Sequence, residues 1–155
     1  MRILLSALLL AGTAISVSAM EKAGISDRVI LSETNPAHLS EFGFFDGDAG
    51  RPAAGLIPYT LGTPLFSDYA EKQRFIHLPD NGEIGVEDDD GRLIFPVGTA
   101  LIKNFGYDDG AGQLKIMETR VLLNRENGWI ALPYVWRPDG SDADLRVGGA
   151  RLPVG

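Results

Sequence analysis

The feature that most limits the fold of this chain is how often turn-forming residues interrupt its apolar segments. From Leu56 onward, Gly, Pro, Asn and Asp break the sequence into short apolar runs, and no long segment keeps a helical period. The chain holds 19 Gly and 9 Pro, and short apolar runs separated by such residues are typical of antiparallel β domains. We therefore predict a mainly β fold, a small antiparallel sandwich or irregular barrel, with one or two short helices.

The clearest strand pair lies near the end of the chain. Residues 114–123 and 129–136 are each long enough for a strand, and Asn127 and Gly128 between them offer the positive φ angles of a tight turn. Both faces of the first strand are substantially apolar, which predicts a central position in the sheet. Pro133 has no N–H to donate, so we expect the second strand to be at an edge or bulged there.

The remaining elements are expected to be short. Apolar runs bounded by turns predict strands over residues 73–78, 84–86, 93–95 and 99–105. A helix is expected to begin at Asn35 and Pro36, because Asn is a good N-cap and Pro suits the first helical position. Leu39 and Phe42 would share its apolar face, and Gly43 would end it.

The first nineteen residues have the pattern of a secretory signal peptide. Arg2 supplies a positive charge, residues 3–14 form an apolar stretch, and small side chains precede Ala19, which predicts cleavage between Ala19 and Met20. An uncleaved N-terminal anchor is the alternative. We expect a periplasmic or secreted protein, with a flexible lead-in over residues 20–34, one β-rich domain over residues 35–155, and no stable membrane insertion after cleavage.

Charge and cysteine content exclude several classes of function. The formal net charge is −7 at pH 7, and an acidic surface repels nucleic acid and anionic lipid, so we expect neither as a partner. The chain contains no Cys. A Cys-x-x-Cys-His haem attachment, a thiolate metal site and a Cys nucleophile are therefore excluded within these residues.

Two pairs of residues are candidates for binding a ligand or partner. Asp68 and Tyr69 follow Ser67 in a segment that resembles the start of a helical turn, where Ser67 or Asp68 would cap the turn while Phe66 and Tyr69 pack. The functional alternative is that Asp68 binds a ligand or metal. The second pair, Glu118 and Arg120, lies on the predicted central strand.

Glu118 and Arg120 alternate along that central strand and are expected to be neighbours on one partly buried face. We predict a structural ion pair with a satisfied hydrogen-bond network. The alternative is a functional carboxylate held in place by Arg120. On simple alternation, Leu114, Ile116 and Leu122 would share the face of this pair.

Aromatic and acidic clusters suggest two further alternatives. Tyr134 and Trp136 share a strand face, so core packing is expected, and a carbohydrate-binding face that also uses Trp129 is the alternative. Asp139, Asp142 and Asp144 are weak calcium candidates, because they lack the spacing of an EF-hand loop and suit solvated turns. His38 and His77 lie far apart in sequence with no third ligand indicated, so we predict no zinc site.

Several sequence blocks, taken in order, resemble the N-terminal region of a bacterial family of exported proteins, often labelled conserved hypothetical or dihaem c-type cytochrome. The resemblance covers roughly residues 39–150. Its most distinctive blocks are Leu39-Ser40-Glu41-Phe42-Gly43-Phe44-Phe45, Ile57-Pro58-Tyr59, residues 63–72, Arg74-Phe75, Phe95-Pro96-Val97-Gly98-Thr99, Leu101-Ile102-Lys103, Glu118-Thr119-Arg120 and Leu132-Pro133-Tyr134-Val135-Trp136.

The resemblance implies electron transfer outside these residues. Related proteins continue into a segment that carries Cys-x-x-Cys-His motifs, so haem c is implied only downstream, and this chain looks like the N-terminal part of such a protein, truncated or split. We expect no cofactor within the chain itself. The expected partner is a haem-bearing segment or a periplasmic redox protein, and the family supplies no catalytic residues to carry over.

We therefore expect a non-catalytic periplasmic domain that supports a haem segment or redox partner lying outside this chain. An extracytoplasmic module that binds carbohydrate or another ligand is one alternative. A hydrolase or lyase that uses carboxylates such as Asp68 and Glu118 is the other, and it requires both groups in one concave pocket.

Overall fold

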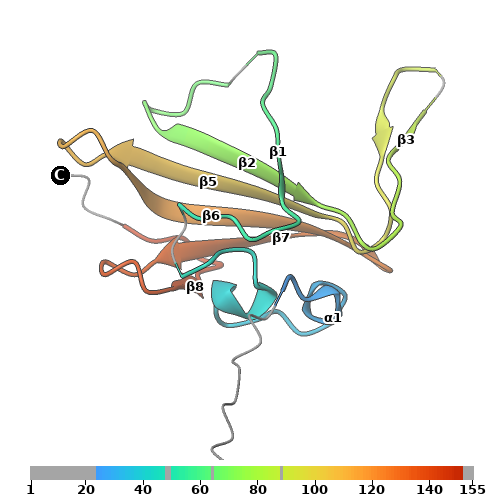
Figure 1. The fold of residues 1–155 in the computed structure, drawn as a ribbon, viewed down its shortest axis with the longest axis horizontal. Coiled ribbons are helices and arrows are strands. Elements are labelled where there is room, and N and C mark those ends of the chain that lie inside the picture. Colours follow the sequence, from blue (N-terminus) through green and yellow to red (C-terminus); the bar gives the residue numbers. More distant parts are fainter. Residues whose placement is uncertain (1–23, 48–49, 64, 88, 152–155) are drawn as a thin grey trace, which may run out of the picture.

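A computed structural model describes residues 24–47, 50–63, 65–87 and 89–151. The predicted mainly β fold is confirmed: in these residues six antiparallel strands form one open sheet in the order β1-β2-β5-β6-β7-β8, and β3 pairs with β4 in a separate hairpin (Figure 1). The elements are α1 (Asp27–Ile30), the 3-10 helix η1 (Leu39–Phe42), β1 (Ile57–Pro58), β2 (Glu71–His77), β3 (Gly85–Val86), β4 (Leu93–Ile94), β5 (Ala100–Asp108), β6 (Leu114–Arg125), β7 (Gly128–Trp136) and β8 (Ala143–Leu145).

The long hairpin of β6 and β7 forms as predicted, and β6 lies between β5 and β7. In its turn Gly128 has φ +100°, whereas Asn127 does not take a positive φ, so only one of the two expected residues does so. The carbonyl of Pro133 accepts a hydrogen bond from the N–H of Arg146 at 2.9 Å. Because the N and C=O of one strand residue point to the same side, the nitrogen of Pro133 also faces away from β6. The missing N–H of Pro133 therefore removes no hydrogen bond between β6 and β7.

A β-bulge changes which residues of β6 share a face. The register shifts between Phe105 and Gly106 of β5, where Phe105 pairs with Glu118 and Gly106 pairs with Ile116, so Met117 is the extra residue. Ile116 therefore packs against the core, and the expectation that it shares the face of Glu118 is wrong. Gly106 permits the bulge, because a Cβ there would lie 2.5 Å from the carbonyl oxygen of Lys115.

One face of the sheet is covered by the N-terminal part of the domain: in Figure 1, α1 lies below the strands and the chain that leads to β1 crosses in front of them. Phe42 stacks on Phe44 with ring centroids 4.9 Å apart and meets Tyr134 edge-to-face at 5.9 Å. All three side chains are fully buried, together with Ile30. The burial of these large apolar side chains supplies most of the driving force for folding, so the covered face holds the core.

Residues 24–34 differ from the flexible lead-in expected from the sequence. Ser26 caps α1, accepting a hydrogen bond from the N–H of Val29 at 3.4 Å. Ile30 is fully buried and Ile25 packs against the core. The guanidinium of Arg125 donates to the carbonyl of Ile30 at 2.8 Å, which fixes the end of α1 against β6. The predicted signal peptide and cleavage site lie outside the described residues.

The helix expected to begin at Asn35 begins later. Pro36 is buried and precedes the helix, and η1 has His38 at its N-cap, whose N–H donates to the carboxylate of Glu41 at 2.9 Å. Gly43 ends η1 with φ +72°, as predicted, and a Cβ there would lie 2.6 Å from the carbonyl oxygen of Gly24.

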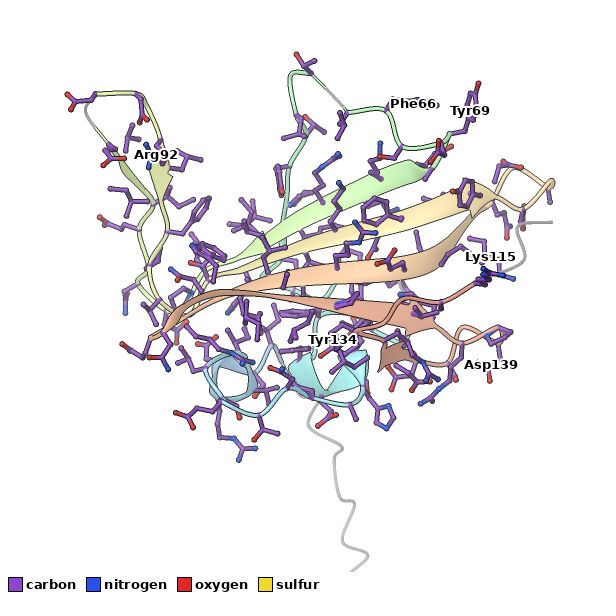
Figure 2. All side chains as sticks on the ribbon, turned by 180° about the vertical axis from the view of Figure 1, so that it is seen from behind. Phe66, Tyr69, Arg92, Lys115, Tyr134 and Asp139 are labelled. Atoms are coloured by element: carbon purple, nitrogen blue, oxygen red, sulfur yellow. The ribbon has the colours of Figure 1, made fainter. Side chains whose placement is uncertain are left out.

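Two segments project beyond the sheet on the side of β1 and β2. One is the loop that carries Phe66 and Tyr69, and the other is the β3–β4 hairpin that carries Arg92 (Figure 2). Within the residues that the structure describes, no helix is long and apolar enough to cross a membrane.

Candidate functional site

The second face of the sheet, which we call the open face, is the candidate functional site (Figure 2). None of its side chains belongs to the buried core cluster of the described residues. The register places twelve of them on β2, β5, β6 and β7, and all are half-buried or exposed: Lys72, Arg74, Ile76, Leu101, Lys103, Phe105, Glu118, Arg120, Leu122, Ala131, Pro133 and Val135.

These side chains form three rows that run across the strands. Directly opposed partners in neighbouring strands give an apolar row, Ile76–Leu101–Leu122–Ala131; a second row, Arg74–Lys103–Arg120–Pro133; and a third row, Lys72–Phe105–Glu118–Val135. Neighbours within a row are about 5 Å apart, and successive rows are about 7 Å apart. The second row brings three basic residues side by side, and we call these three the cationic row.

The cationic row is electrostatically unfavourable by itself. Arg74, Lys103 and Arg120 are directly opposed, and like charges in this arrangement destabilise a sheet. Among the described residues no carboxylate forms an ion pair with Arg74 or Lys103. The pKa of Lys103 is lowered, first by burial and then by the charges of Arg74, Lys72 and Arg120. The open face thus concentrates positive charge on a chain whose net charge is −7.

Phe105 and Glu118 lie beside the cationic row and contact it. Two cations contact the ring of Phe105: Lys103 Nζ and the guanidinium carbon of Arg120 each lie 4.5 Å from the ring centroid. Glu118 accepts two hydrogen bonds from Arg120, at 2.7 and 3.1 Å, and this bonding raises the pKa of Arg120. The ion pair predicted for Glu118 and Arg120 therefore forms, but on the open face, where Arg120 is exposed.

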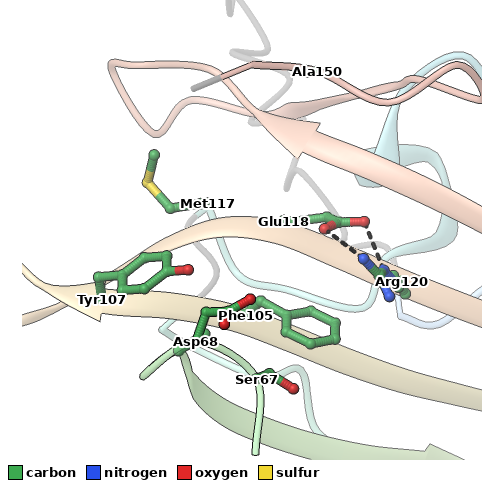
Figure 3. Close-up of a pocket in the computed structure, with 9 residues that line it drawn as sticks. Ser67, Asp68, Phe105, Tyr107, Met117, Glu118, Arg120 and Ala150 are labelled. Atoms are coloured by element: carbon green, nitrogen blue, oxygen red, sulfur yellow. Dashed lines mark hydrogen bonds and ion pairs between the residues drawn. The ribbon is translucent and has the colours of Figure 1, made fainter. Parts of the chain in front are cut away.

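The bulge end of the open face holds a pocket of about 400 Å³. Its walls come from β5, β6, the loop before β2 and the segment after β8, and its lining includes Phe105, Tyr107, Met117, Asp68 and Ala150 (Figure 3). Figure 3 shows the Glu118–Arg120 pair at one end of the pocket and Met117 and Tyr107 at the other. This size suits a small ligand or an inserted side chain.

The loop that forms one wall of this pocket contains a tight turn. Asp68 and Tyr69 have φ +44° and +62°, and the N–H of Ala70 donates to the carbonyl of Ser67 at 2.8 Å. A turn with two positive φ angles favours Asn-Gly, so Tyr69 in this position carries backbone strain. The helical turn expected here is absent, and Phe66 and Tyr69 are exposed rather than packed in the core, at 67% and 87%.

Tyr134 and Trp136 do not form a binding platform. Tyr134 is fully buried and its hydroxyl donates to the carbonyl of Pro36 at 3.0 Å. Trp136 is buried and its Nε1–H donates to Thr119 Oγ1 at 2.8 Å. Trp129 points to the other face and meets Phe95 edge-to-face. Core packing therefore explains Tyr134 and Trp136, whereas Trp129 stays 46% exposed.

The acidic residues after β7 are engaged within the fold. Asp139 accepts hydrogen bonds from the N–H and hydroxyl of Ser141, and the carboxylate of Asp142 accepts from Ser40. Asp144 accepts hydrogen bonds from Arg137, which together with His38 lower the pKa of that carboxyl. Within the described part of the chain, no three His, Cys, Asp or Glu side chains form a group that could hold a metal ion.

Sequence reasoning found Asp68, Glu118 and Arg120, which the structure brings to one pocket. It missed Arg74, Lys103 and Phe105. Alternation along each strand places Arg74 and Lys103 on one face of their own strands. Only the pairing register places them opposite each other and opposite Arg120.

Comparison of the whole chain with protein-family models, with curated proteins and with solved structures gives no match.

Proposed function

We propose that this domain is a non-catalytic docking domain of an exported, c-type-cytochrome-like protein, and that its open face binds a haem-bearing segment or a redox partner. The observation that carries the proposal is the difference between the two faces of one sheet. The covered face is complete, whereas the open face presents apolar, aromatic and basic side chains that no core element of the described residues covers. Export and the haem partner rest on the sequence features and on the family resemblance.

The apolar content of this side of the molecule supports docking. Leu122 on the open face is 39% exposed, and Leu65, Phe66 and Tyr69 are exposed on the loop that borders the pocket. Large exposed apolar side chains that gather on one side of a domain mark protein-interaction surfaces. Aromatic residues and Arg are also the residue types enriched at such interfaces.

A carboxylate-dependent hydrolase or lyase is the second candidate, because Asp68 and Glu118 line the same pocket. Arg120 holds both oxygens of Glu118 through hydrogen bonds, so this carboxylate is already engaged with a neighbouring side chain. Asp68 lies on an exposed turn. These contacts support binding more than they support acid–base catalysis.

The test is site-specific photo-cross-linking in the bacterium that carries the gene. A photoreactive amino acid replaces Leu122 on the open face, and the matched control replaces Leu31, which has similar exposure, 44%, and follows α1 on the opposite side of the sheet. After irradiation, adducts are separated under denaturing conditions and stained for covalently bound haem.

The expected result is an adduct at position 122 that stains for haem and no such adduct at position 31. Adducts at position 122 without haem, no adduct at all, or equal haem-positive adducts at both positions would overturn the proposal. Digestion of the adduct and mass spectrometry then identify whether the bound haem belongs to a separate protein or to a further segment of the same polypeptide.

A further inference from the structure

We infer that the cationic row of Arg74, Lys103 and Arg120 is a recognition site for carboxylates spread along an acidic polypeptide. The apolar row beside the cationic row contacts apolar side chains of the same polypeptide. This inference rests on the docking role proposed for the open face and names the chemistry of its partner.

The charges of the open face favour an anion from outside. Its rows carry the basic side chains of Lys72, Arg74, Lys103 and Arg120, and Glu118 is the one acidic residue in them. Glu118 already pairs with Arg120. Arg74 and Lys103 still repel each other, and a bound anion would relieve this repulsion.

The spacing of the row favours several anions in a line over a single compact one. The three basic residues stand on three adjacent strands, so their Cα atoms span about 10 Å. A single phosphate or sulfate group would have to draw the three side chains together, whereas anions in a line meet each side chain above its own strand. Carboxylates three or four residues apart on a helix, or two apart on a strand, are separated by about 5–7 Å and match the row.

The neighbouring rows favour a polypeptide over a sugar or nucleic-acid polyanion. Ile76, Leu101 and Leu122 run parallel to the cationic row about 7 Å away. Removing these half-buried or exposed aliphatic side chains from water contributes to binding free energy only if the ligand brings apolar groups of its own. An acidic polypeptide with interspersed apolar side chains provides both.

The chain itself displays the contact that the proposal requires. Glu118 meets Arg120 through two hydrogen bonds on the open face, beside the ring of Phe105. Arg and carboxylate form this paired geometry with directional specificity. Arg74 and Lys103 offer further donors in the same line for carboxylates of a partner.

The experiment measures binding of a labelled peptide, Gly-Glu-Leu-Glu-Glu-Leu-Glu-Gly, to the purified protein by fluorescence anisotropy at low salt. Lys103→Met is expected to weaken binding about fivefold, the loss of one modest ion pair. The matched control is Lys115→Met on the neighbouring strand β6, which removes the same charge from the same face of the sheet beyond the bulge and is expected to leave binding within about twofold. Raising the salt concentration should weaken binding to the wild type more than to Lys103→Met.

Three results would overturn the inference: equal binding of the peptide with Gln in place of Glu, equal losses in Lys103→Met and Lys115→Met, or displacement of the peptide by inorganic pyrophosphate or heparin at concentrations similar to those of the peptide itself. Thermal melts of both variants verify folding, and Lys103→Gln provides a second test with a polar side chain. A haem-positive cross-link at position 122, together with unchanged peptide binding in Lys103→Met, would support the docking role and contradict this inference. Peptide binding that Lys103→Met weakens, without the cross-link, would support this inference and contradict the docking role.

Discussion

The two faces of the same sheet differ in how their polar and charged side chains are paired. On the covered face, polar groups that become buried are satisfied: Thr119 donates to Asn104 at 2.6 Å and accepts from Trp136 at 2.8 Å. On the open face, side chains only one residue away along the strands place like charges opposite one another, as Lys103 and Arg120 do. Burial makes the polar groups of one face pair with each other, whereas contact with water allows like charges to stay opposed on the other face. Under the proposed docking role, a bound partner would relieve that opposition.

The largest expected effect separates two adjacent leucines of β6. Leu123 is fully buried and Leu122 is 39% exposed on the opposite face. Leu123→Ala should lower the free energy of unfolding by about 2–5 kcal/mol, because it loses buried apolar area and leaves a cavity. Leu122→Ala should cost less than about 1 kcal/mol. Urea denaturation of both variants measures the difference, and similar costs would show that the open face is packed as tightly as the core.

A second comparison removes polar contacts from the two faces. Thr119→Val deprives Trp136 and Asn104 of a buried hydrogen-bond partner, which should cost about 1–3 kcal/mol. Arg120→Gln removes an exposed ion pair and also relieves repulsion of Lys103, so its cost should stay within about 0.5 kcal/mol. Chemical denaturation of the purified variants measures both. A larger loss for Arg120→Gln than for Thr119→Val would contradict the ranking.

The smallest expected effect has the opposite sign. Lys103→Met should raise the stability of the unliganded protein by about 0.2–1 kcal/mol, because it removes a charge opposed to Arg74 and Arg120. Added salt should stabilise the wild type more than the variant, since it screens the same repulsion. Thermal unfolding at low and high salt measures this effect, and a destabilised Lys103→Met would mean that the charge already has a favourable partner.

The pH dependence of Lys103 has a definite sign. Its pKa in the folded protein is lower than the ordinary value of 10.5, so between these two pKa values the unfolded chain binds more protons than the folded one. The stability of the wild type relative to Lys103→Met should therefore rise as pH increases through that window, and the gain is complete above 10.5. A difference that stays flat or falls with pH would contradict the burial and repulsion inferred for Lys103.

Local sequence patterns predicted much of the fold. The β class, the strands over residues 73–78 and 114–123, and the turn ending at Gly128 follow from apolar runs and turn residues, and they correspond to β2, β6 and the start of β7. The bulge at Met117 did not follow from the sequence of its own strand, because it depends on Gly106 of β5 opposite it. The misassigned face of Ile116 has the same cause.

The candidate site divides in the same way. Glu118 and Arg120 could be recognised as a pair because they alternate along one strand. Tyr134 and Trp136 were correctly placed on a shared face, but only the packing of Phe42 and Phe44 makes that face the core. The cationic row needs the register of three strands, which residues far apart in sequence determine together.

The sequence by itself determined where this chain turns and which segments extend, since those preferences act between residues close along the backbone. The tertiary structure decided which face of the sheet is covered, where the bulge shifts the alternation, and that three positive charges meet on the open face. These depend on contacts between residues such as Arg74 and Lys103, or Phe42 and Tyr134, whose proximity exists only after the strands have paired.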